Sequence, residues 1–540
     1  MIRRLLPLAV LLGLVAGCSA TSGREGEPDT RPTPPRTLTR PAPPQLSQRA
    51  RPPAKTAEPK PKPEAKPKPA RARPSRARVY VVVVNGDTNR RVRRARVRIG
   101  GRSDRSDVRG LAVLTLRRRA ALPVTVSARG YTTRTVRLPF SKRRQGTIRL
   151  YRPAQQWAMY GVDPTRTQAH EEIHVRPPFR IVWSRGIGDL IEFPAVVSDG
   201  FAYIGNLRGT VRALSMRSGK VVWRRDVKGG KMAASPAVVG DSLVVHGMDG
   251  RVRVLDRRNG RLRWSFNVGS PIESSPVVRG GLDYFGAWDG NVYALDLRRR
   301  RIAWTFRSGY KITSSPSLAG ERLFIGDYGG QLLALGPRTG RLQWVRSVNG
   351  RVYGTPAVAG GRVFVPSSTG GSLTAFTTTG RELWSRRTGG YVYSSPAVWA
   401  GRVLFGSYNG VFYGLSARTG AALWSIQTQG PISGAVAVVD GIAYAGSFSN
   451  VILGVRATTG RVLLRFPHGQ YVPVSGNAGR LLLHGYSRIF AVEPRGGTQG
   501  SSAGPLLKRQ TRRGRAVAAP GGARLRREVK GKQTAAPRRG

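Results

Sequence analysis

The sequence predicts an all-β protein: an eight-bladed β-propeller preceded by a small β-sandwich. Two observations carry this prediction. From residue 179 onwards one pattern returns about every 40 residues, and each repeat holds short apolar runs separated by glycine turns. Between residues 78 and 151 apolar and polar side chains alternate, as they do along half-buried strands. A repeat of four short strands must stack on its neighbours to bury both faces, which is typical of a propeller blade.

Residues 1–18 have the composition of an export signal. Arg3 and Arg4 precede an apolar run, residues 5–15, which is too short to span a bilayer comfortably. The run ends in Val-Ala-Gly-Cys18, which closely resembles the lipobox of bacterial lipoproteins. This resemblance implies export, cleavage before Cys18 and lipidation of its thiol, with the outer membrane as destination in a cell that has one. The alternative is an ordinary signal peptide with an unrelated cysteine.

Cys18 is also the single cysteine of the chain. A single cysteine excludes a disulfide framework, a cysteine-based zinc site and a redox pair.

Two basic segments lack the apolar side chains that a core requires. Residues 19–77 alternate Pro with Lys between 59 and 69, which favours an extended polyproline II chain. Residues 497–540 contain twelve Lys and Arg and one acid, Glu528. We expect both segments to be disordered. The first would be a spacer or a solubilising linker, and the second a solvated tail or a weak contact with a polyanion.

The charge of the chain restricts its partners. It has 91 Lys and Arg against 28 Asp and Glu, a formal charge of +63. Such a balance favours nucleic acid, anionic lipid or an acidic wall polymer as partner. Because the N-terminus predicts export, we exclude nucleic acid and keep the lipid and the polymer.

Residues 78–151 are predicted to form the small β-sandwich. Strands are expected at 79–84, 95–99, 111–116, 124–128 and 133–138. The second strand should bury Ala95, Val97 and Ile99 and expose the arginines between them. Several turns resemble those of the carboxypeptidase-regulatory-like domain: Ala95-x-Val97, Ser106-Asp107-x-x-Gly110-x-Ala112 and Val126-x-Ala128-Arg129-Gly130-Tyr131. The resemblance implies a non-catalytic accessory module.

Tryptophan marks the last strand of each repeat in residues 152–496, the predicted propeller. Seven residues form this tryptophan ladder: Trp183, Trp223, Trp264, Trp304, Trp344, Trp384 and Trp424. Their spacing is 40 residues, once 41, and Leu464 takes the next place. A proline ladder marks the start of six repeats and Val436 takes the next place, so complete units begin near residues 194, 236, 276, 316, 356, 396 and 436.

The ends of the array predict how it closes. Residues 480–484 and 489–492 are equivalent to the middle strands of one more blade, which lacks its tryptophan strand. Residues 179–183 are a tryptophan strand with no blade in front of it. We therefore expect the two ends to pair in a shared eighth blade, which removes the open sheet edges.

Two motifs point to a family. Runs such as Ala213-Leu214-Ser215 precede Ser/Thr-Gly-x-x-x-Trp, and residues 157–164 read Trp-Ala-Met-Tyr-Gly-Val-Asp-Pro. Both resemble the pyrroloquinoline-quinone-like propeller repeat. One branch of that superfamily is the quinoprotein dehydrogenases, and another is the non-enzymatic lipoprotein of the outer-membrane β-barrel assembly machinery.

The resemblance also implies a role for the tryptophan ladder. In the family each tryptophan docks on a peptide of the neighbouring blade, so we expect a structural ladder without cofactor ligands. In the third repeat Arg300 replaces the usual glycine, which should weaken that one turn only.

One motif with metal-ligand spacing occurs. His170-Glu171-Glu172-Ile173-His174 fits HExxH, in which two histidines on one helical face bind zinc. Pro177 and Pro178 follow closely, and His246, His468 and His484 lie far along the chain with no ligand spacing. We therefore expect a polar surface connector and no metal site, with zinc-dependent hydrolysis as the alternative.

Quinone-dependent oxidation is a further alternative. It would need a carboxylate base and a calcium site, and often a vicinal cysteine pair, which this chain lacks. The candidate carboxylates lie at different turns: Asp189, Glu192, Asp249, Asp289 and Asp327. Asp249-Gly250 and Asp289-Gly290 fit hairpin turns better. We expect no catalytic residue and no cofactor.

The sequence thus predicts an exported, lipid-anchored, non-enzymatic scaffold with a protein partner in the cell envelope. Resemblance to the barrel-assembly lipoprotein favours a role in outer-membrane assembly. The alternative is an envelope sensor or a protein that binds wall polymer or another polyanion.

Overall fold

The computed structural model describes residues 77–116, 121–140, 144–227, 230–471 and 473–496. The regular structure of these residues is β-strand, apart from one 3-10 turn, η1 (Pro153–Gln155). No helix within them is long and apolar enough to cross a membrane. Cys18, the basic tail and almost all of the predicted linker lie outside the described residues.

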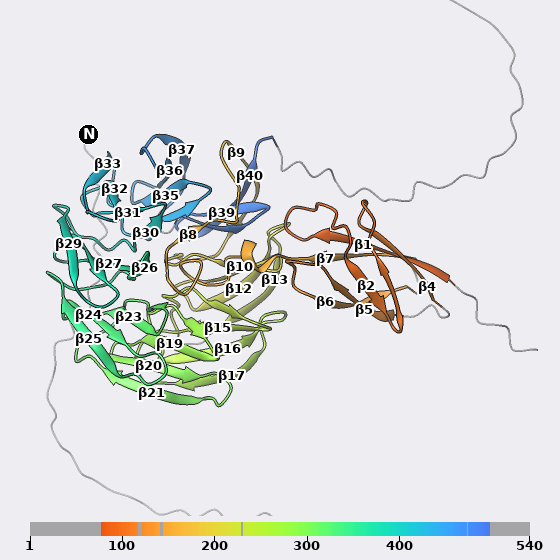
Figure 1. Ribbon diagram of the computed structural model, residues 1–540, viewed down its shortest axis with the longest axis horizontal. Helices are drawn as coiled ribbons and strands as arrows, with labels where there is room; N and C mark the ends of the chain where they lie inside the picture. Colours follow the sequence, from red (N-terminus) through yellow and green to blue (C-terminus); the bar gives the residue numbers. More distant parts are fainter. Residues whose placement is uncertain (1–76, 117–120, 141–143, 228–229, 472, 497–540) are drawn as a thin grey trace, which may run out of the picture. The chain divides into compact units, whose positions relative to one another are not determined.

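The first part of this chain forms two sheets around one core (Figure 1). One sheet has the order β4-β1-β7 and the other β3-β2-β5-β6. The strands are β1 (Ala77–Asn85), β2 (Arg96–Ile99), β3 (Arg102–Arg105), β4 (Leu111–Leu116), β5 (Ala121–Ser127), β6 (Arg134–Pro139) and β7 (Gln145–Leu150).

The predicted alternation of the second strand is confirmed. Ala95, Val97 and Ile99 are buried, while Arg96 and Arg98 are exposed. The buried residues pack against valines of β1 from the other sheet. Strands β3 and β7 were not predicted.

Six four-stranded sheets follow, each with its strands in chain order. The first three contain β10 (Val196–Ser198), β11 (Phe201–Gly205), β12 (Thr210–Ser215), β13 (Val221–Asp226), β14 (Ala237–Val239), β15 (Ser242–His246), β16 (Arg251–Asp256), β17 (Leu262–Asn267), β18 (Val277–Arg279), β19 (Leu282–Gly286), β20 (Asn291–Asp296) and β21 (Arg301–Arg307). The next three contain β22 (Ser317–Ala319), β23 (Arg322–Gly326), β24 (Gln331–Leu335), β25 (Leu342–Ser347), β26 (Ala357–Ala359), β27 (Arg362–Ser367), β28 (Ser372–Thr377), β29 (Glu382–Arg387), β30 (Ala397–Trp399), β31 (Arg402–Gly406), β32 (Val411–Ser416) and β33 (Ala422–Gln427).

A five-stranded sheet comes next, with the order β37-β36-β35-β34-β8. Its strands are β8 (Ala169–His170), β34 (Ala437–Val439), β35 (Ile442–Ser447), β36 (Val451–Arg456) and β37 (Val462–Pro467). Strand β8 comes from far upstream and pairs in parallel with β34.

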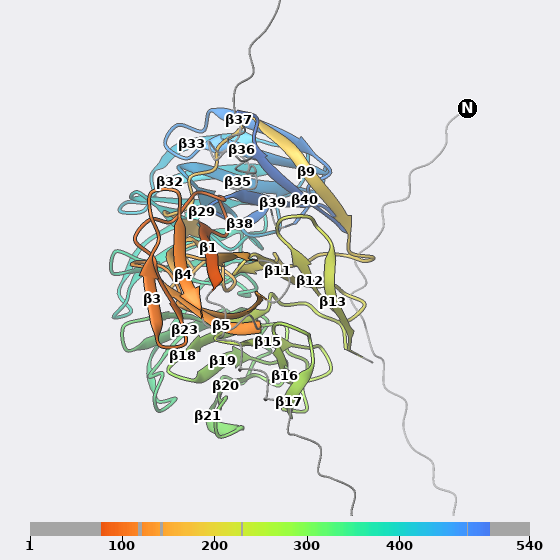
Figure 2. The ribbon, with the colours of Figure 1, turned by 90° about the vertical axis from the view of Figure 1, so that its right-hand side faces the viewer.

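The last sheet joins the two ends of the array, as the sequence predicts. Strands β38 (Val474–Asn477), β39 (Arg480–His484) and β40 (Arg488–Pro494) are completed by β9 (Phe179–Gly186). Strand β9 lies beside β40 (Figure 2) and is antiparallel to it. Trp183 pairs with Ala491 across the two strands. The pairing joins residues about 300 positions apart in the chain.

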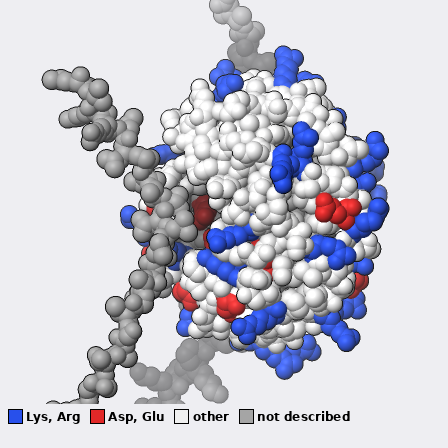
Figure 3. Space-filling view, turned by 90° about the vertical axis from the view of Figure 1, so that its left-hand side faces the viewer, with Lys and Arg blue, Asp and Glu red and all other residues white. Residues whose placement is uncertain are grey.

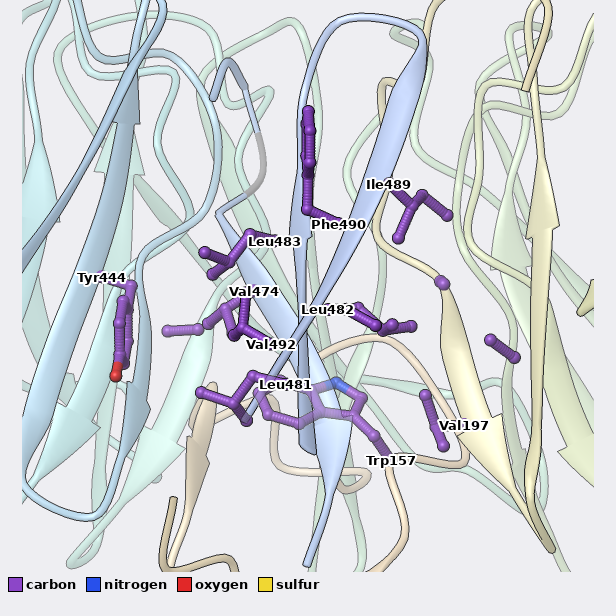
Figure 4. Packing of buried hydrophobic residues seen from close by; sticks show 14 of the residues in the cluster. Trp157, Val197, Tyr444, Val474, Leu481, Leu482, Leu483, Ile489, Phe490 and Val492 are labelled. Carbon is purple, nitrogen blue, oxygen red and sulfur yellow. The ribbon is translucent and has the colours of Figure 1, made fainter. Parts of the chain in front are cut away.

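The core of this last sheet binds both ends to their neighbours. Leu481, Leu482 and Ile489 are fully buried, and Trp157 lies beside them (Figure 4). Val197 of the first sheet and Tyr444 of the five-stranded sheet belong to the same cluster (Figure 4). Apolar burial of about 25 cal/mol per Å² therefore stabilises the joint beyond its strand hydrogen bonds.

Residues 157–168, which we call the lead-in segment, connect the first strands of successive sheets. Trp157 exchanges two backbone hydrogen bonds with Val197. Further along, carbonyls of the segment accept from first-strand amides, in these donor–acceptor pairs: Val238–Ala158, Leu318–Pro164, Val358–Thr165, Val398–Thr167 and Val438–Gln168, at 2.7–2.9 Å. One short segment thereby satisfies backbone donors in several sheets.

Arg166 fills the place between the third and fourth sheets. Its side chain is fully buried and donates to the carbonyls of Pro316, Ser275, Pro276 and Tyr160. Burial lowers the pKa of this guanidinium to about 10, so it remains charged at neutral pH. Its hydrogen bonds all go to carbonyl oxygens, and the charges of Asp163 and Asp283 also favour its protonated form.

Candidate functional site

The tryptophan ladder lies between adjacent sheets. Six indole Nε1 groups donate to a backbone carbonyl of the next sheet, in the pairs Trp183–Met216, Trp223–Arg257, Trp304–Pro337, Trp344–Thr378, Trp384–Ala417 and Trp424–Ala457, at 2.9–3.3 Å. Each of the six rings also lies against a glycine. A Cβ added at Gly340, for example, would stand 2.6 Å from the Trp304 ring. These contacts join each sheet to the next.

The third repeat departs from this arrangement. Trp264 meets Arg300, whose guanidinium carbon lies 6.0 Å from the ring centroid. No hydrogen bond from the Trp264 indole is present among the described residues.

The residues of the HExxH motif are separated by their environments. His170 belongs to β8 and is buried, with Nε2 at 3.0 Å from the Gln156 carbonyl. His174 is exposed and lies 3.0 Å from Asp440. There is no helix here, so the two rings do not share a helical face. The predicted surface connector is wrong for His170, because pairing of β8 with β34 buries it.

An open hollow of about 730 Å³ lies beside this segment. Glu171, Glu172, Arg362 and Arg418 line it together with Trp399, so both signs of charge are present.

Four of the five candidate carboxylates are engaged locally. Asp189 pairs with Arg208 at 3.3 Å, and Asp249 accepts from Arg253 at 2.9 Å. Asp289 accepts from the Tyr293 hydroxyl at 2.6 Å. Asp327 accepts from the Gln331 amide at 3.0 Å. Within the described residues no cluster of three or more His, Cys, Asp or Glu side chains is placed to hold a metal ion.

The fifth carboxylate, Glu192, lines a central cavity of about 160 Å³. The loops that connect the last strand of one sheet to the first strand of the next supply most of its lining: Glu192, Phe193, Glu273, Thr313, Ser315, Tyr353, Thr355, Tyr393, Ser395, Ser433 and Tyr471. Tyr160 of the lead-in segment contributes as well, and its hydroxyl donates to Ser395 at 3.0 Å.

Two carboxylates share this cavity. Burial, and secondarily the charge of Glu273, raises the pKa of Glu192 to about 7. Burial also raises the pKa of Glu273, although its Oε2 accepts from the Trp288 indole at 3.0 Å. Adding a positive group here would favour the ionised form of both.

A row of aromatic side chains extends from this cavity over the loops, and we call it the aromatic arc: Trp288, Tyr328, Tyr353, Tyr393, Tyr408, Phe448 and Tyr471. Successive rings from Tyr328 to Tyr471 have centroids 4.5–5.7 Å apart. The Lys311 ammonium joins Trp288 to the row, at 3.2 Å from its ring centroid and 5.1 Å from that of Tyr328. All seven residues are at least partly accessible to solvent.

The arc was not predicted from the sequence, although a signal for it exists. Trp288, Tyr328, Tyr408 and Phe448 each stand two residues beyond a Gly or Ser near the end of a second strand, at separations that are multiples of 40. Aromatic residues in one register of several repeats must lie on one face of the array.

A second surface is strongly basic. Arg96, Arg98, Arg105 and Arg137 are exposed on the sheet β3-β2-β5-β6. Arg96 pairs directly with Arg105 across the strands. Within the described residues none of the four forms an ion pair. Like charges directly opposite each other destabilise a sheet.

The comparisons with known proteins agree with the repeat pattern. A family profile described as outer membrane protein assembly factor BamB matches residues 207–352 and 351–517, which together exceed half of the chain. The chain belongs to this family. Outer membrane protein assembly factor BamB of Bordetella pertussis is 32% identical over 74 residues, 14% of this chain and 19% of that protein. The chain thus matches about a fifth of that relative's length.

Solved structures show the fold of this BamB-family chain. BamB from Moraxella catarrhalis superposes with a TM-score of 0.52 at 18% identity, over 58% of this chain and 99% of that one. The quinohemoprotein alcohol dehydrogenase from Comamonas testosteroni gives 0.55 at 14% identity, over 63% and 80%. The repeated sheets are therefore those of a β-propeller, and the predicted likeness to the pyrroloquinoline-quinone-like repeat is confirmed.

Proposed function

We propose that this chain is an exported, lipid-anchored, non-enzymatic propeller that binds protein partners during outer-membrane protein assembly. Family membership supports the role in outer-membrane protein assembly. The aromatic arc supports the binding of protein partners. The proposed organisation is a lipoprotein signal with Cys18 as the anchor (1–18), a linker (19–77), a carboxypeptidase-regulatory-like sandwich (78–151), an eight-bladed propeller (152–496) and a basic tail (497–540).

The aromatic arc is the observation that carries this proposal. Tyrosine and tryptophan are enriched at protein interfaces, where they supply large contact areas with few rotatable bonds. Tyr391 and Tyr486 are each 50% exposed beside the arc, so the apolar surface continues past it. A face of this composition is suited to a protein more than to a small hydrophilic substrate.

The fit of the carboxylates supports a non-enzymatic role. A quinone with a divalent cation would need carboxylate and amide oxygens converging on one site. Among the described residues, Glu192 and Glu273 are the only carboxylates that line the central cavity, and the other candidates contact neighbours near their own turns.

The experiment compares two variants of the full-length chain in a source cell that has an outer membrane. Tyr393→Ala/Tyr408→Ala should lower the amount of assembled outer-membrane β-barrel proteins and abolish cross-linking of the chain to the assembly machinery. Tyr80→Ala, outside the arc, should change neither. Normal assembly with the double variant would contradict the proposed interface, and a source cell without an outer membrane would contradict the process.

The arginine face of β2 and β3 favours polyanion binding as a second function. The repulsion between Arg96 and Arg105 would be relieved by an anionic polymer lying across them. Arg96→Gln/Arg98→Gln should then weaken retention on a heparin matrix more than Arg261→Gln/Arg301→Gln. Equal retention of both double variants would show that charge alone, and not this face, binds the matrix.

A further inference from the structure

The central cavity contains polar groups that the fold leaves without partners. Thr313 is 7% exposed, and its Oγ1, which lines the cavity, has no hydrogen-bond partner among the described residues. No hydrogen bond or ion pair to the Glu192 carboxylate is present in that part of the chain either. Buried polar groups are normally hydrogen-bonded, so the Thr313 hydroxyl points to a ligand. The half-buried Glu192 carboxylate in the same cavity requires that ligand to supply donors.

The lining defines the charge of that ligand. Glu192 and Glu273 provide carboxylate acceptors, and Thr313 adds a hydroxyl. Tyr353 and Tyr393 also line the cavity, and aromatic rings attract cations. The chain already uses this contact nearby, where Lys311 lies 3.2 Å from the Trp288 ring centroid. A protonated amine, with three N–H donors, meets all of these groups.

The volume of the cavity limits the size of the ligand. The cavity, of about 160 Å³, can admit an unbranched side chain such as that of lysine, with four methylenes and an ammonium, but not a folded segment of a partner.

We propose that the central cavity binds a lysine side chain of a protein partner, with the ammonium at Glu192 and Glu273 and the methylenes against the tyrosines. The inference rests on the proposed function, because it names the chemistry of the partner that the aromatic arc receives. The surrounding arc and the exposed Tyr391 and Tyr486 favour a protein as the source over a free amine.

The positive charge of the rest of the molecule disfavours binding of a cation anywhere except at the cavity. The chain carries +63, and on the face seen in Figure 3 Lys and Arg side chains outnumber and surround the few carboxylates. A cationic probe is repelled by such a surface. Binding of a cationic probe to this protein therefore requires a local acidic site.

The test uses saturation-transfer NMR with the full-length protein and three probes: the peptide acetyl-Gly-Ser-Lys-Ser-Gly-amide, its norleucine analogue and n-butylammonium. We expect transfer to the methylenes of the lysine peptide and little to the norleucine peptide. Equal transfer to the two peptides would overturn the proposal. Stronger binding of n-butylammonium than of the lysine peptide would overturn the assignment to a protein side chain.

Variants locate the binding. Glu192→Gln/Glu273→Gln should lower the affinity for the lysine peptide at least tenfold, because both charges are lost at constant shape. Glu321→Gln, which removes an exposed carboxylate paired with Arg338, should leave the affinity unchanged. An equal midpoint of thermal unfolding in the two proteins shows that the comparison reports binding. Unchanged affinity of the double variant would overturn the proposal.

The pH dependence gives an independent readout. Glu273, Tyr160, Tyr393 and Tyr471 share the cavity with Glu192, and Lys311 lies beyond Glu273. Burial raises the pKa of each of the three tyrosines, so they stay neutral near pH 7. With a Glu192 pKa of about 7, affinity should fall about tenfold from pH 8 to pH 6 as this carboxylate is protonated.

The outcomes separate this inference from the proposed function. Peptide binding needs no assembly machinery, so its absence would overturn the lysine pocket while the arc variants still test the interface. If the pocket binds the peptide but the arc variants assemble β-barrels normally, the proposed function fails and the pocket remains.

Discussion

Arg300 occupies the position against the ring of Trp264 at which six other repeats place a glycine against their tryptophan. Its φ angle of 57° is left-handed, a conformation that costs a non-glycine residue about 1 kcal/mol. Trp264, which belongs to the preceding repeat, is also the ladder residue for which no indole hydrogen bond to the next sheet is present among the described residues. Arg300 thus coincides with a strained turn and with a tryptophan that is not hydrogen-bonded to the next sheet in the described part of the chain.

Replacing Arg300 by glycine should therefore stabilise the propeller. We expect Arg300→Gly to raise the free energy of unfolding by about 1 kcal/mol, measured by urea denaturation, because strain is relieved and the indole can dock. Gly340→Arg, at the equivalent site under Trp304, should lower it by about 2 kcal/mol or more. Destabilisation by Arg300→Gly would show that the contact with Trp264 outweighs the strain.

Arg166 should be among the most sensitive residues of the fold. Arg166→Met leaves the carbonyls of Pro316, Ser275 and Pro276 buried without donors, and the expected loss is about 3–5 kcal/mol. Arg166→Lys should rescue little, because a single ammonium cannot replace bonds from three guanidinium nitrogens. Arg224→Met, which breaks an exposed ion pair with Asp226, is the control and should cost less than about 0.5 kcal/mol. Equal unfolding midpoints in all three variants would contradict this role.

The regular parts of the fold were predictable because they repeat. The strands of each sheet are short and follow one another closely in the sequence. The tryptophan at a fixed position of the repeat shows where the last strand of each sheet lies. Even the closure by β9 could be predicted, since Trp183 belonged to a strand without a blade. His170 was misjudged because its burial depends on a parallel pairing with a strand more than 260 residues away.

The candidate site was less accessible to prediction. The central cavity takes one or two residues from each of several loops, so no local motif contains it. Glu192 appeared in the sequence as one carboxylate among five, and only the three-dimensional structure places it with Glu273 and the tyrosines. The 40-residue spacing of Trp288, Tyr328, Tyr408 and Phe448 was the one available signal.

The joint between the two ends should control the stability of the whole array. Deleting residues 153–185 removes β9, β8 and the lead-in segment, exposing the edges of β40 and β34. We expect aggregation or a large fall in the thermal midpoint, followed by circular dichroism and light scattering. Deleting residues 497–540 is the control and should leave the midpoint unchanged. An intact midpoint after the first deletion would mean that the array does not depend on its closure.

Acid should destabilise the fold through His484. This histidine is fully buried, and its Nε2 accepts from the Ala195 amide at 3.2 Å, which requires an unprotonated Nε2. Burial lowers the pKa of His484 to about 4, below the 6.5 of an unfolded chain. Between these pH values the unfolded state binds more protons than the folded state. The free energy of unfolding therefore falls by about 3 kcal/mol from this residue as the pH drops from 6.5 to 4.

His484→Gln keeps an acceptor for Ala195 but cannot titrate, and it should flatten the dependence of the unfolding free energy on pH in this range. His468→Gln, at an exposed ring, is the matched control and should retain the wild-type slope. If His484→Gln showed that slope as well, protonation of His484 could not be the cause.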